Sequence, residues 1–506
     1  MPAEVSLLLH PLHRRLTVPR GAPLQDVLFP LGVEFPCGGR GRCRGCRVRV
    51  LAGELPITPE DQRLLGPERL VQGWRLACQA RADADLTLEL AQWETPILSD
   101  ETPVAFAPRP GLGAAVDVGT TTVVAQVLDL TTGQVLGVRS ALNAQARHGA
   151  DIMSRIEFAL GEPGRAELTR LIREQIGALL ADLLGTVPGR GPLLAVVLVG
   201  NTVMHHLFGG LPVAPLAHCP FEPAAPGLQE FRGEELGWDF AGAAHVSFLP
   251  CPGGFVGSDI LAGILATGLD RSERPAMLVD LGTNGEIVVG DRTRLLCAST
   301  AAGPAFEGAR LAMGMRAATG AISAVSLRDG AWQVTVLGGG EPRGICGSGL
   351  VDAVACGLEA GRILPSGRLV GGPTLPLAGP VELTQADLRE LQLAKGAIAA
   401  GIHLLLKRLG LQPGDLARVW LAGAFGNYIS RASARRIGLL PFPVEQVEPA
   451  GNTALRGTKQ VLCGAHGPDR NFADLRARIE HVPLKDDPRF QEAFVAAMGF
   501  PAPGHG

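Results

Sequence analysis

The sequence feature that most constrains the fold is a short pattern, Asp-x-Gly-Thr, that occurs twice. It begins at Asp117 and again at Asp280, and each copy follows an apolar run, at 114–116 and at 276–279. A short apolar run that ends in an acidic residue and a glycine is typical of a buried strand followed by a tight turn. Because strands and helices alternate after both copies, the pattern predicts an α/β chain with two related lobes.

The elements expected around the two turns repeat in outline. In the first half we expect strands at 114–118, 122–130 and 193–199 and helices at 152–160 and 167–184. In the second half we expect strands at 276–281, 285–289 and 419–421 and helices at 350–358 and 386–409. The predicted division is a first lobe over 114–272, a second lobe over 273–480 and a C-terminal tail over 481–506.

The residue types in the two turns suit phosphate and a metal ion. An aspartate at a strand end can hold Mg²⁺ directly or through water, a glycine lets backbone amides approach phosphate, and threonine hydroxyls add donors. One such turn alone is also compatible with an ordinary β-turn, and the second copy favours phosphate binding. The candidates are Asp117, Gly119, Thr120 and Thr121 in the first turn, and Asp280, Gly282, Thr283 and Asn284 in the second.

Several other positions follow strands or precede helices. Asn201 could contact phosphate or an attacking water, and Glu307 is the best further carboxylate for positioning that water. Gly347 lies in a glycine-rich approach to a helix, where either phosphate binding or tight packing would need glycine. Adjacent residues on a helix diverge, so His205 and His206 are interpreted as a packed helix start rather than a metal or acid–base pair. Walker-type ATPases are excluded, since no lysine lies in Gly-x4-Gly-Lys-Ser/Thr.

The ten cysteines of the 506 residues are unevenly placed. The run Cys-x5-Cys-x2-Cys places three thiols on one glycine-rich loop, and a fourth follows later, which suits the four thiolates of a [2Fe–2S] cluster. Zinc is the alternative, but it usually takes two Cys-x2–4-Cys pairs, and only one occurs here. The expected ligands are Cys37, Cys43, Cys46 and Cys78. The default for the rest is small buried hydrophobes: Cys219, Cys251, Cys297, Cys346, Cys356 and Cys463.

The cysteine-rich segment forms a domain of its own in this interpretation. Residues 1–92 are β-rich, with a hairpin expected over 5–18, a short helix over 22–31 and strands over 47–51 and 86–90. The cysteine spacing resembles the adrenodoxin-like branch of [2Fe–2S] ferredoxins, which implies a β-grasp fold. A proline-rich linker is expected over 93–113.

Composition excludes several classes of protein. With 46% hydrophobic and 19% charged residues, each domain can bury a core, so a disordered chain is excluded. A net charge of −3 is not the balance of a nucleic-acid-binding protein. No signal peptide is evident, and the longest apolar run, 193–199, is too short to span a membrane. A cytoplasmic protein without nucleic-acid or membrane partners is therefore expected.

A third glycine turn completes a resemblance to a known superfamily. It follows the strand at 419–421 and contains Gly423, Ala424 and Gly426. Two acidic turns that face each other across a cleft, with a later glycine turn, resemble the actin-like ATPases. That superfamily implies that the third turn binds adenosine, and its usual two glycines are Gly-Ala here.

The whole chain resembles the reductive activators of corrinoid enzymes. The resemblance rests on Gly-Asn-Thr-Val-Met-His-His-Leu from residue 200, Val-Asp-Leu-Gly-Thr-Asn-Gly-Glu from 279 and Leu-Ala-Gly-Ala-Phe-Gly-Asn from 421. It implies an ATP-driven transfer of one electron from a [2Fe–2S] cluster to the cob(II)amide of a partner corrinoid protein, with Mg²⁺ and an upstream electron donor. No Asp-x-His-x2-Gly run occurs, so the corrinoid is expected on the partner.

Two other functions stay open from the residues alone. One is a ferredoxin-type electron carrier with nucleotide-gated binding to a non-corrinoid enzyme. The other is a small-molecule kinase with a redox-sensing domain. The sequence names neither the corrinoid partner nor the donor, and it leaves the oligomeric state open, a homodimer included.

Overall fold

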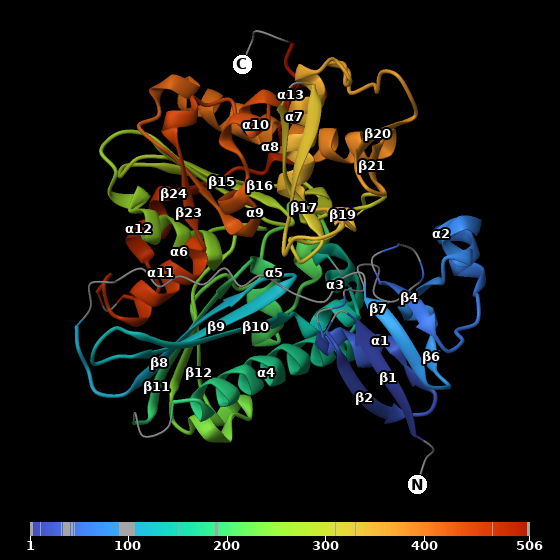
Figure 1. The fold of residues 1–506 in the computed structure, drawn as a ribbon. Coiled ribbons are helices and arrows are strands. Elements are labelled where there is room, and N and C mark those ends of the chain that lie inside the picture. The colour runs from blue at the N-terminus through green and yellow to red at the C-terminus, as the bar shows by residue number, and fades with distance from the viewer. Residues whose placement is uncertain are drawn as a thin grey trace.

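The chain folds into an N-terminal domain and two larger lobes (Figure 1). The structure is a computed structural model that describes residues 4–10, 12–31, 33, 41, 44, 46–90, 107–149, 151–187, 191–308, 310–328, 330–467 and 469–502. In Figure 1 the second lobe lies above the first, and the N-terminal domain lies at one side.

The N-terminal domain is built on a five-stranded sheet with the order β2-β1-β7-β4-β5. The β1 and β7 strands run parallel, whereas the other neighbours are antiparallel. The predicted hairpin, short helix and strands are confirmed. The elements are β1 Glu4–His10, β2 Arg14–Pro19, β3 Ala22–Pro23, α1 Leu24–Leu28, η1 Phe29–Leu31, β4 Arg47–Ala52, α2 Pro59–Val71, β5 Trp74–Leu76, η2 Ala77–Gln79, β6 Arg81–Ala82 and β7 Leu86–Leu90.

The first lobe has a six-stranded sheet with the order β10-β9-β8-β11-β13-β12. The two strands on either side of the first turn are an antiparallel hairpin, and β11 and β13 add parallel to it. Its main elements are β8 Leu112–Val118, β9 Thr122–Asp129, β10 Val135–Leu142, η3 Ala144–Arg147, α3 Ile152–Ala159, α4 Glu162–Gly185, β11 Leu193–Gly200, α5 Thr202–Gly209, β12 Gln229–Arg232, β13 His245–Phe248 and α6 Ser258–Thr267.

The second lobe has a six-stranded sheet with the order β23-β22-β14-β15-β16-β24 and two small additional sheets. Its strands are β14 Ala276–Leu281, β15 Gly285–Gly290, β16 Leu295–Thr300, β17 Ala321–Arg328, β18 Ala331–Val336, β19 Gly344–Ile345, β20 Thr374–Ala378, β21 Val381–Thr384, β22 Val419–Ala422, β23 Val447–Gly451 and β24 Ile479–His481. Its helices are α7 Gly347–Glu359, α8 Gln385–Leu409, α9 Gly423–Tyr428, α10 Arg431–Arg436, α11 Thr453–Leu462, α12 Ala473–Arg478 and α13 Pro488–Met498.

The two lobes share one topology, as the repeated turns predict. In each, three antiparallel strands are followed by two parallel ones, in the orders β10-β9-β8-β11-β13 and β16-β15-β14-β22-β23. The helices that follow the last strand of each order, α6 after β13 and α11 after β23, lie against each other between the lobes (Figure 1). They approach so closely that a Cβ on Gly457 would lie 2.0 Å from the carbonyl oxygen of Ala262. The contact between α6 and α11 therefore joins the two lobes.

The C-terminal segment differs from the predicted tail. Helix α13 packs along α8, Phe500 is buried, and Gln392 Nε2 donates to the carbonyl of Met498 at 3.1 Å. The described residues after 481 thus belong to the second lobe. Phe490, Phe494 and Met498 recur at every fourth residue of α13, a spacing typical of a packed helix face that the prediction of a tail did not take into account. The first lobe also begins slightly earlier than predicted, with β8 at Leu112.

The N-terminal domain contacts both lobes. Leu142 at the end of β10 is part of its hydrophobic core, and the guanidinium of Arg147 lies 5.4 Å from the ring centre of Phe29. On the second lobe, Arg343 forms an ion pair with Glu89 at 3.0 Å. Arg47 also donates a hydrogen bond to the carbonyl of Ala312.

Candidate functional site

The first turn forms at the end of β8 because a glycine stands where no side chain fits. The amide of Gly119 donates to the carbonyl of Thr122 at 3.1 Å, and a Cβ on Gly119 would lie 2.5 Å from that oxygen. In the second turn, the amide of Gly282 donates to the carbonyl of Asn284 at 3.0 Å, two residues on instead of three. Both copies of Asp-x-Gly-Thr therefore form a tight turn after β8 and β14, and the second turn closes one residue sooner.

The two turns meet across the boundary between the lobes. The hydroxyl oxygens of Thr121 and Thr283 are 3.4 Å apart, although one belongs to each lobe. Thr283 Oγ1 also donates to Glu307 Oε1 at 2.7 Å. Asn201 lies on the first-lobe side, where its Nδ2 donates to Thr120 Oγ1 at 2.8 Å. The structure thus brings together candidate residues from four separate segments.

Five carboxyl groups lie around this cleft, those of Asp117, Asp259, Asp280, Glu286 and Glu307, and burial raises the pKa of each. Burial raises the pKa of Asp117 to about 6. Burial, together with the negative charge of Asp117, raises the pKa of Asp280 to about 7. Burial and those two aspartates raise the pKa of Asp259 to about 8, and the pKa of Glu286 is also well above its ordinary value. Such shifts mean that negative charge in the cleft lacks compensation.

This charge fits Mg²⁺ that arrives with a phosphate ligand. Among the described residues, no three His, Cys, Asp or Glu side chains are close enough to hold a metal ion by themselves. Mg²⁺ usually keeps several waters and binds one or two carboxylates together with substrate phosphates. The raised pKa values of the carboxyl groups match that mode.

Three polar residues of the cleft are not predicted by the repeated pattern. Asp259 lies in the first turn of α6, and Asn452 is the N-cap of α11, from which its Nδ2 donates to Asp117 Oδ2 at 3.3 Å. Glu286 lies opposite Asp280 in the β14–β15 pair. The two helices are equivalent in the two repeats, so a search for polar residues at their starts could have found Asp259 and Asn452.

The third glycine turn lies beside the second. Gly423 follows β22 with a φ of +86°, and a Cβ there would lie 2.6 Å from Asp280 Oδ1. The ring of Phe425 in α9 stacks on Phe306 with 4.5 Å between centroids. The side chain of Ala424 lies outside the described part, and Gly426 is buried in α9.

Tight packing accounts for the glycines at the start of α7. A Cβ on Gly347 would lie 1.9 Å from the carbonyl oxygen of Phe306, and one on Gly349 would lie 2.2 Å from that of Ile322. Both glycines are buried. Of the two interpretations that the sequence left open for Gly347, packing has this direct support, and phosphate binding stays a prediction.

The adjacent histidines of α5 are packed, as the sequence predicts. Both are fully buried, and their ring nitrogens lie 2.9 Å from backbone carbonyls, those of Gly227 for His205 and Thr202 for His206. Burial lowers the pKa of His205 to about 3 and also lowers that of His206. Both rings are therefore neutral at ordinary pH.

Two of the four predicted cluster cysteines are described, and the fold brings their segments together. The amide of Ala77 donates to the carbonyl of Cys46 at 3.0 Å, which places Cys46 beside Cys78. Gln79 Nε2 lies 3.4 Å from Cys78 Sγ, as an amide donor to a cluster thiolate would. Cys37 and Cys43 lie outside the described residues. The described part of the loop therefore fits an iron–sulfur cluster.

Gly41, which lies between Cys37 and Cys43 in the sequence, is held by α2. Gly41 has a φ of +62°, and a Cβ there would lie 2.7 Å from Glu60 Cγ. Arg63 of α2 donates to the carbonyl of Gly41 at 2.6 Å. A side chain here would be strained by the positive φ and would require Glu60 and Gln79 to move, so glycine is favoured at this position.

Most of the other cysteines fit their default role. Cys251, Cys297, Cys346 and Cys463 are buried, and burial raises the pKa of Cys251 and Cys297 to about 12. Cys356 is partly buried. Cys219 is exposed, so the default of a buried hydrophobe is wrong for that residue.

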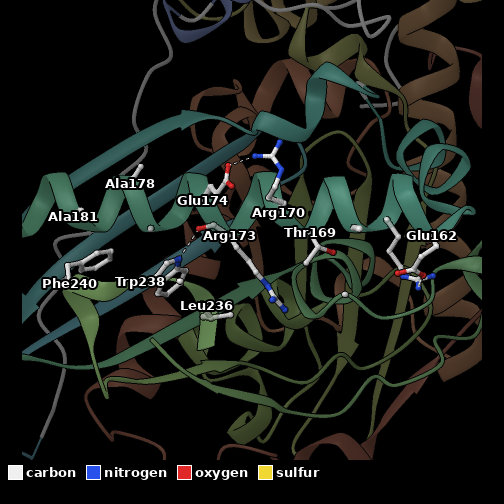
Figure 2. Close-up of a pocket in the computed structure, with 15 residues that line it drawn as sticks. Glu162, Thr169, Arg170, Arg173, Glu174, Ala178, Ala181, Leu236, Trp238 and Phe240 are labelled. Atoms are coloured by element: carbon white, nitrogen blue, oxygen red, sulfur yellow. Dashed lines mark hydrogen bonds and ion pairs between the residues drawn. The ribbon is translucent and has the colours of Figure 1, made fainter. Parts of the chain in front are cut away.

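A pocket of about 750 Å³ lies elsewhere, between α4 and the segment 236–240 (Figure 2). Arg170 pairs with Glu174 along the helix, and Trp238 Nε1 donates to the carbonyl of Arg173 (Figure 2). None of the residues that line it belongs to either turn. The pocket therefore has no direct part in the chemistry of the cleft.

The fold and the site define a ferredoxin domain joined to a two-lobed actin-like domain. Residues 9–83 match the 2Fe-2S iron-sulfur cluster binding domain, residues 112–272 the RACo middle region, and residues 274–505 the C-terminal domain of RACo, the ASKHA domain. The chain belongs to the family of reductive activators of corrinoid proteins.

Relatives of known name support this assignment over most of the chain. The corrinoid activation enzyme RamQ of Eubacterium limosum is 36% identical over 424 residues, which cover 76% of this chain and 70% of that protein. The [Co(II) methylated amine-specific corrinoid protein] reductase of Methanosarcina barkeri is 28% identical and is covered to 77%. A solved reductive activator for a corrinoid, iron-sulfur protein superposes with a TM-score of 0.69 at 26% identity, with 99% of each chain covered.

In the described part of the chain, none of the helices is long and apolar enough to cross a membrane.

Proposed function

We propose that this protein is an ATP-dependent reductive activator, which passes one electron from a [2Fe–2S] cluster to the inactive cob(II)amide of a partner corrinoid protein and restores cob(I)amide. The observation that carries the proposal is the contact between Thr121 and Thr283, which joins two acidic turns from different lobes. A nucleotide bound between them would contact both lobes at once. The names of the relatives support a corrinoid protein as the partner.

The cleft residues would divide the work of binding the nucleotide. Asp117 and Asp280 would hold Mg²⁺, directly or through water, while Asn201 and Glu307 would position the attacking water. The amides and hydroxyls of the turns would bind phosphate, and the third turn would bind adenosine. The binding residues in this assignment are Gly119, Thr120, Thr121, Gly282, Thr283, Asn284, Gly347, Gly423, Ala424 and Gly426.

The N-terminal domain would supply the electron. Cys37, Cys43, Cys46 and Cys78 would hold the cluster, which when bound gives and takes one electron at a time. The amide of Gln79 beside Cys78 would stabilise the added negative charge. An upstream donor must reduce the cluster after each transfer.

ATP is needed because the transfer is uphill in potential. Ferredoxin-type centres have reduction potentials of about −400 mV, whereas cob(I)amide is a much stronger reductant. A conformational bias of about 5.5 kcal/mol changes an equilibrium about 10⁴-fold, and one-electron transfer changes tenfold per ~59 mV. Nucleotide-driven closure of the lobes on the corrinoid partner could therefore offset a gap of roughly 240 mV.

ATP hydrolysis with different partners tests the proposal against the kinase alternative. We expect ADP formation to rise when a cob(II)amide protein is added, and to be lost in Asp117→Asn. The variant Cys78→Ser is the matched control, because it should keep the stimulated ATP hydrolysis and lose only the transfer of the electron to the corrinoid. ADP formation that depends on a small-molecule substrate and ignores the corrinoid protein would contradict the proposal.

A further inference from the structure

Three carbonyl oxygens of the first turn accept hydrogen bonds from buried residues of the first lobe. Asn143 binds two of them, because its Nδ2 donates to the carbonyl of Gly119 and its backbone amide to that of Thr121, each at 2.8 Å. Arg155 of α3 donates to the third, the carbonyl of Thr120. Asn143 and Arg155 are completely buried. Since carbonyl oxygens would repel phosphate, this arrangement leaves amides and hydroxyls to face the cleft.

Asn143 is also the N-cap of the short helix η3. Its Oδ1 accepts from the amide of Gln145 at 3.0 Å, and the buried Gln145 accepts in turn from Arg155 Nη1 at 3.3 Å. Gln175 of α4 accepts from the amide of Ala144 at 2.8 Å. The backbone amide and the side chain of Gln145 are therefore tied to the two residues that hold the turn, whereas Gln175 joins the start of η3 to α4.

The other side of η3 packs against the N-terminal domain. Leu142, directly before Asn143, is part of the hydrophobic core of that domain, and Ala146 packs against the same core. The guanidinium of Arg147 lies over the ring of Phe29. Arg147 is only four residues after Asn143. Because packed interiors transmit displacements, a shift of the turn would also move this contact surface.

We propose that Asn143 and η3 couple the first turn to the N-terminal domain, so that nucleotide binding and the redox state of the cluster depend on each other. Asn143 is a positioning residue in this role, since it acts on nucleotide only through the turn. The inference rests on the proposed function, because it needs a nucleotide in the cleft and a cluster in the loop. By linkage, nucleotide must shift the cluster's potential by the same free energy by which reduction shifts nucleotide affinity.

The test measures the affinity of the full-length protein for Mg·ADP with the cluster oxidised and with it reduced by titanium(III) citrate. In the wild type we expect the two dissociation constants to differ by at least about fivefold, the lower end of typical coupling. In Arg147→Ala the ratio should fall below about twofold while the affinity of the oxidised protein is kept. Arg139→Ala is the matched control, because Arg139 lies on β10, the strand just before η3, but pairs with Asp182 and should keep the wild-type ratio.

A second readout separates coupling from a merely structural role. The midpoint potential of the cluster should shift with Mg·ADP in the wild type and in Arg139→Ala, and stay constant in Arg147→Ala. A tenfold affinity ratio corresponds to a shift of ~59 mV.

Three results would overturn the inference, and they are distinguishable. An Arg147→Ala variant with the wild-type ratio would show that η3 does not carry the coupling. A wild type that binds Mg·ADP equally in both redox states would remove the coupling and leave the proposed function intact. A protein that binds no nucleotide would overturn both.

Discussion

At the scale of single residues, the cleft contains several carboxyl groups whose negative charges repel one another. Burial raises the pKa of Asp117 to about 6, that of Asp280 to about 7 and that of Asp259 to about 8. For Asp280 and Asp259, the negative charges of neighbouring carboxylates add to the effect of burial. In the unfolded chain an aspartate titrates near about 3.9. Between these values the folded protein holds more protons than the unfolded one, so its stability falls as pH rises.

We therefore expect the nucleotide-free protein to be less stable at pH 8 than at pH 6, and Asp259→Asn to lose less stability over that interval than the wild type. A difference of about 1 kcal/mol would move the melting temperature by about 2–4 °C in domains of this size. Thermal unfolding of both proteins at the two pH values measures the effect. An equal decline in both would show that Asp259 does not titrate in this range.

Asn201 has two roles that one substitution removes together. Its Oδ1 accepts from the amides of Val203 and Met204 at the start of α5, and its Nδ2 donates to Thr120. Loss of an N-cap costs about 1 kcal/mol. We expect Asn201→Ala to lower stability by about that amount and also to weaken nucleotide binding, measured by unfolding and by calorimetric titration.

The control for this prediction is the N-cap of a helix outside the cleft. Thr58 caps α2 in the N-terminal domain through a capping box with Asp61. Thr58→Ala should lower stability similarly and leave nucleotide affinity unchanged. Equal affinities in the wild type and Asn201→Ala would rule out a role of Asn201 in the cleft.

At the scale of elements, the sequence predicted the strands and turns of both lobes better than the helices that join them. The strands around Asp117 and Asp280 are short apolar runs with glycine turns, and both lie where expected. Helices α6 and α11 were not predicted. Helix α6 is apolar on nearly all sides, and the close contact of α11 with it depends on Gly457. The polar residues at their starts, Asp259 and Asn452, reach the cleft only through this tertiary packing.

The crossing of α6 and α11 gives a sharp test of packing. In Gly457→Ala the new methyl group would meet the backbone of Ala262, which overpacking typically penalises by about 1–3 kcal/mol, partly offset by alanine's helix preference. We expect a net loss of stability and a changed affinity for nucleotide, because the helices connect the lobes. Urea unfolding and nucleotide titration measure both.

Gly414→Ala is the matched control for this crossing, since a Cβ at Gly414 has no atom within 4 Å. It should leave stability within about 0.5 kcal/mol of the wild type. If Gly457→Ala were equally harmless, the close approach of α6 and α11 would not constrain the lobes.

At the scale of the whole molecule, the N-terminal domain contacts both lobes between which nucleotide is proposed to bind. It packs on the first lobe through Leu142 and Arg147 and pairs with the second through Glu89 and Arg343. These contacts could not be predicted from the sequence, because no local pattern marks a surface that packs only in the folded chain. The cysteine spacing and the two turns, by contrast, are local, and they indicated the family before any contact was known.

The most direct measurement is the spectrum of the corrinoid partner. The reduced protein would be mixed anaerobically with a cob(II)amide protein, with or without Mg·ATP, and formation of cob(I)amide followed by its absorption. The account predicts cob(I)amide with ATP, little without it, and none with Cys78→Ser. Equal cob(I)amide formation with and without ATP would contradict an ATP-driven transfer, and formation by Cys78→Ser would contradict the cluster as the source of the electron.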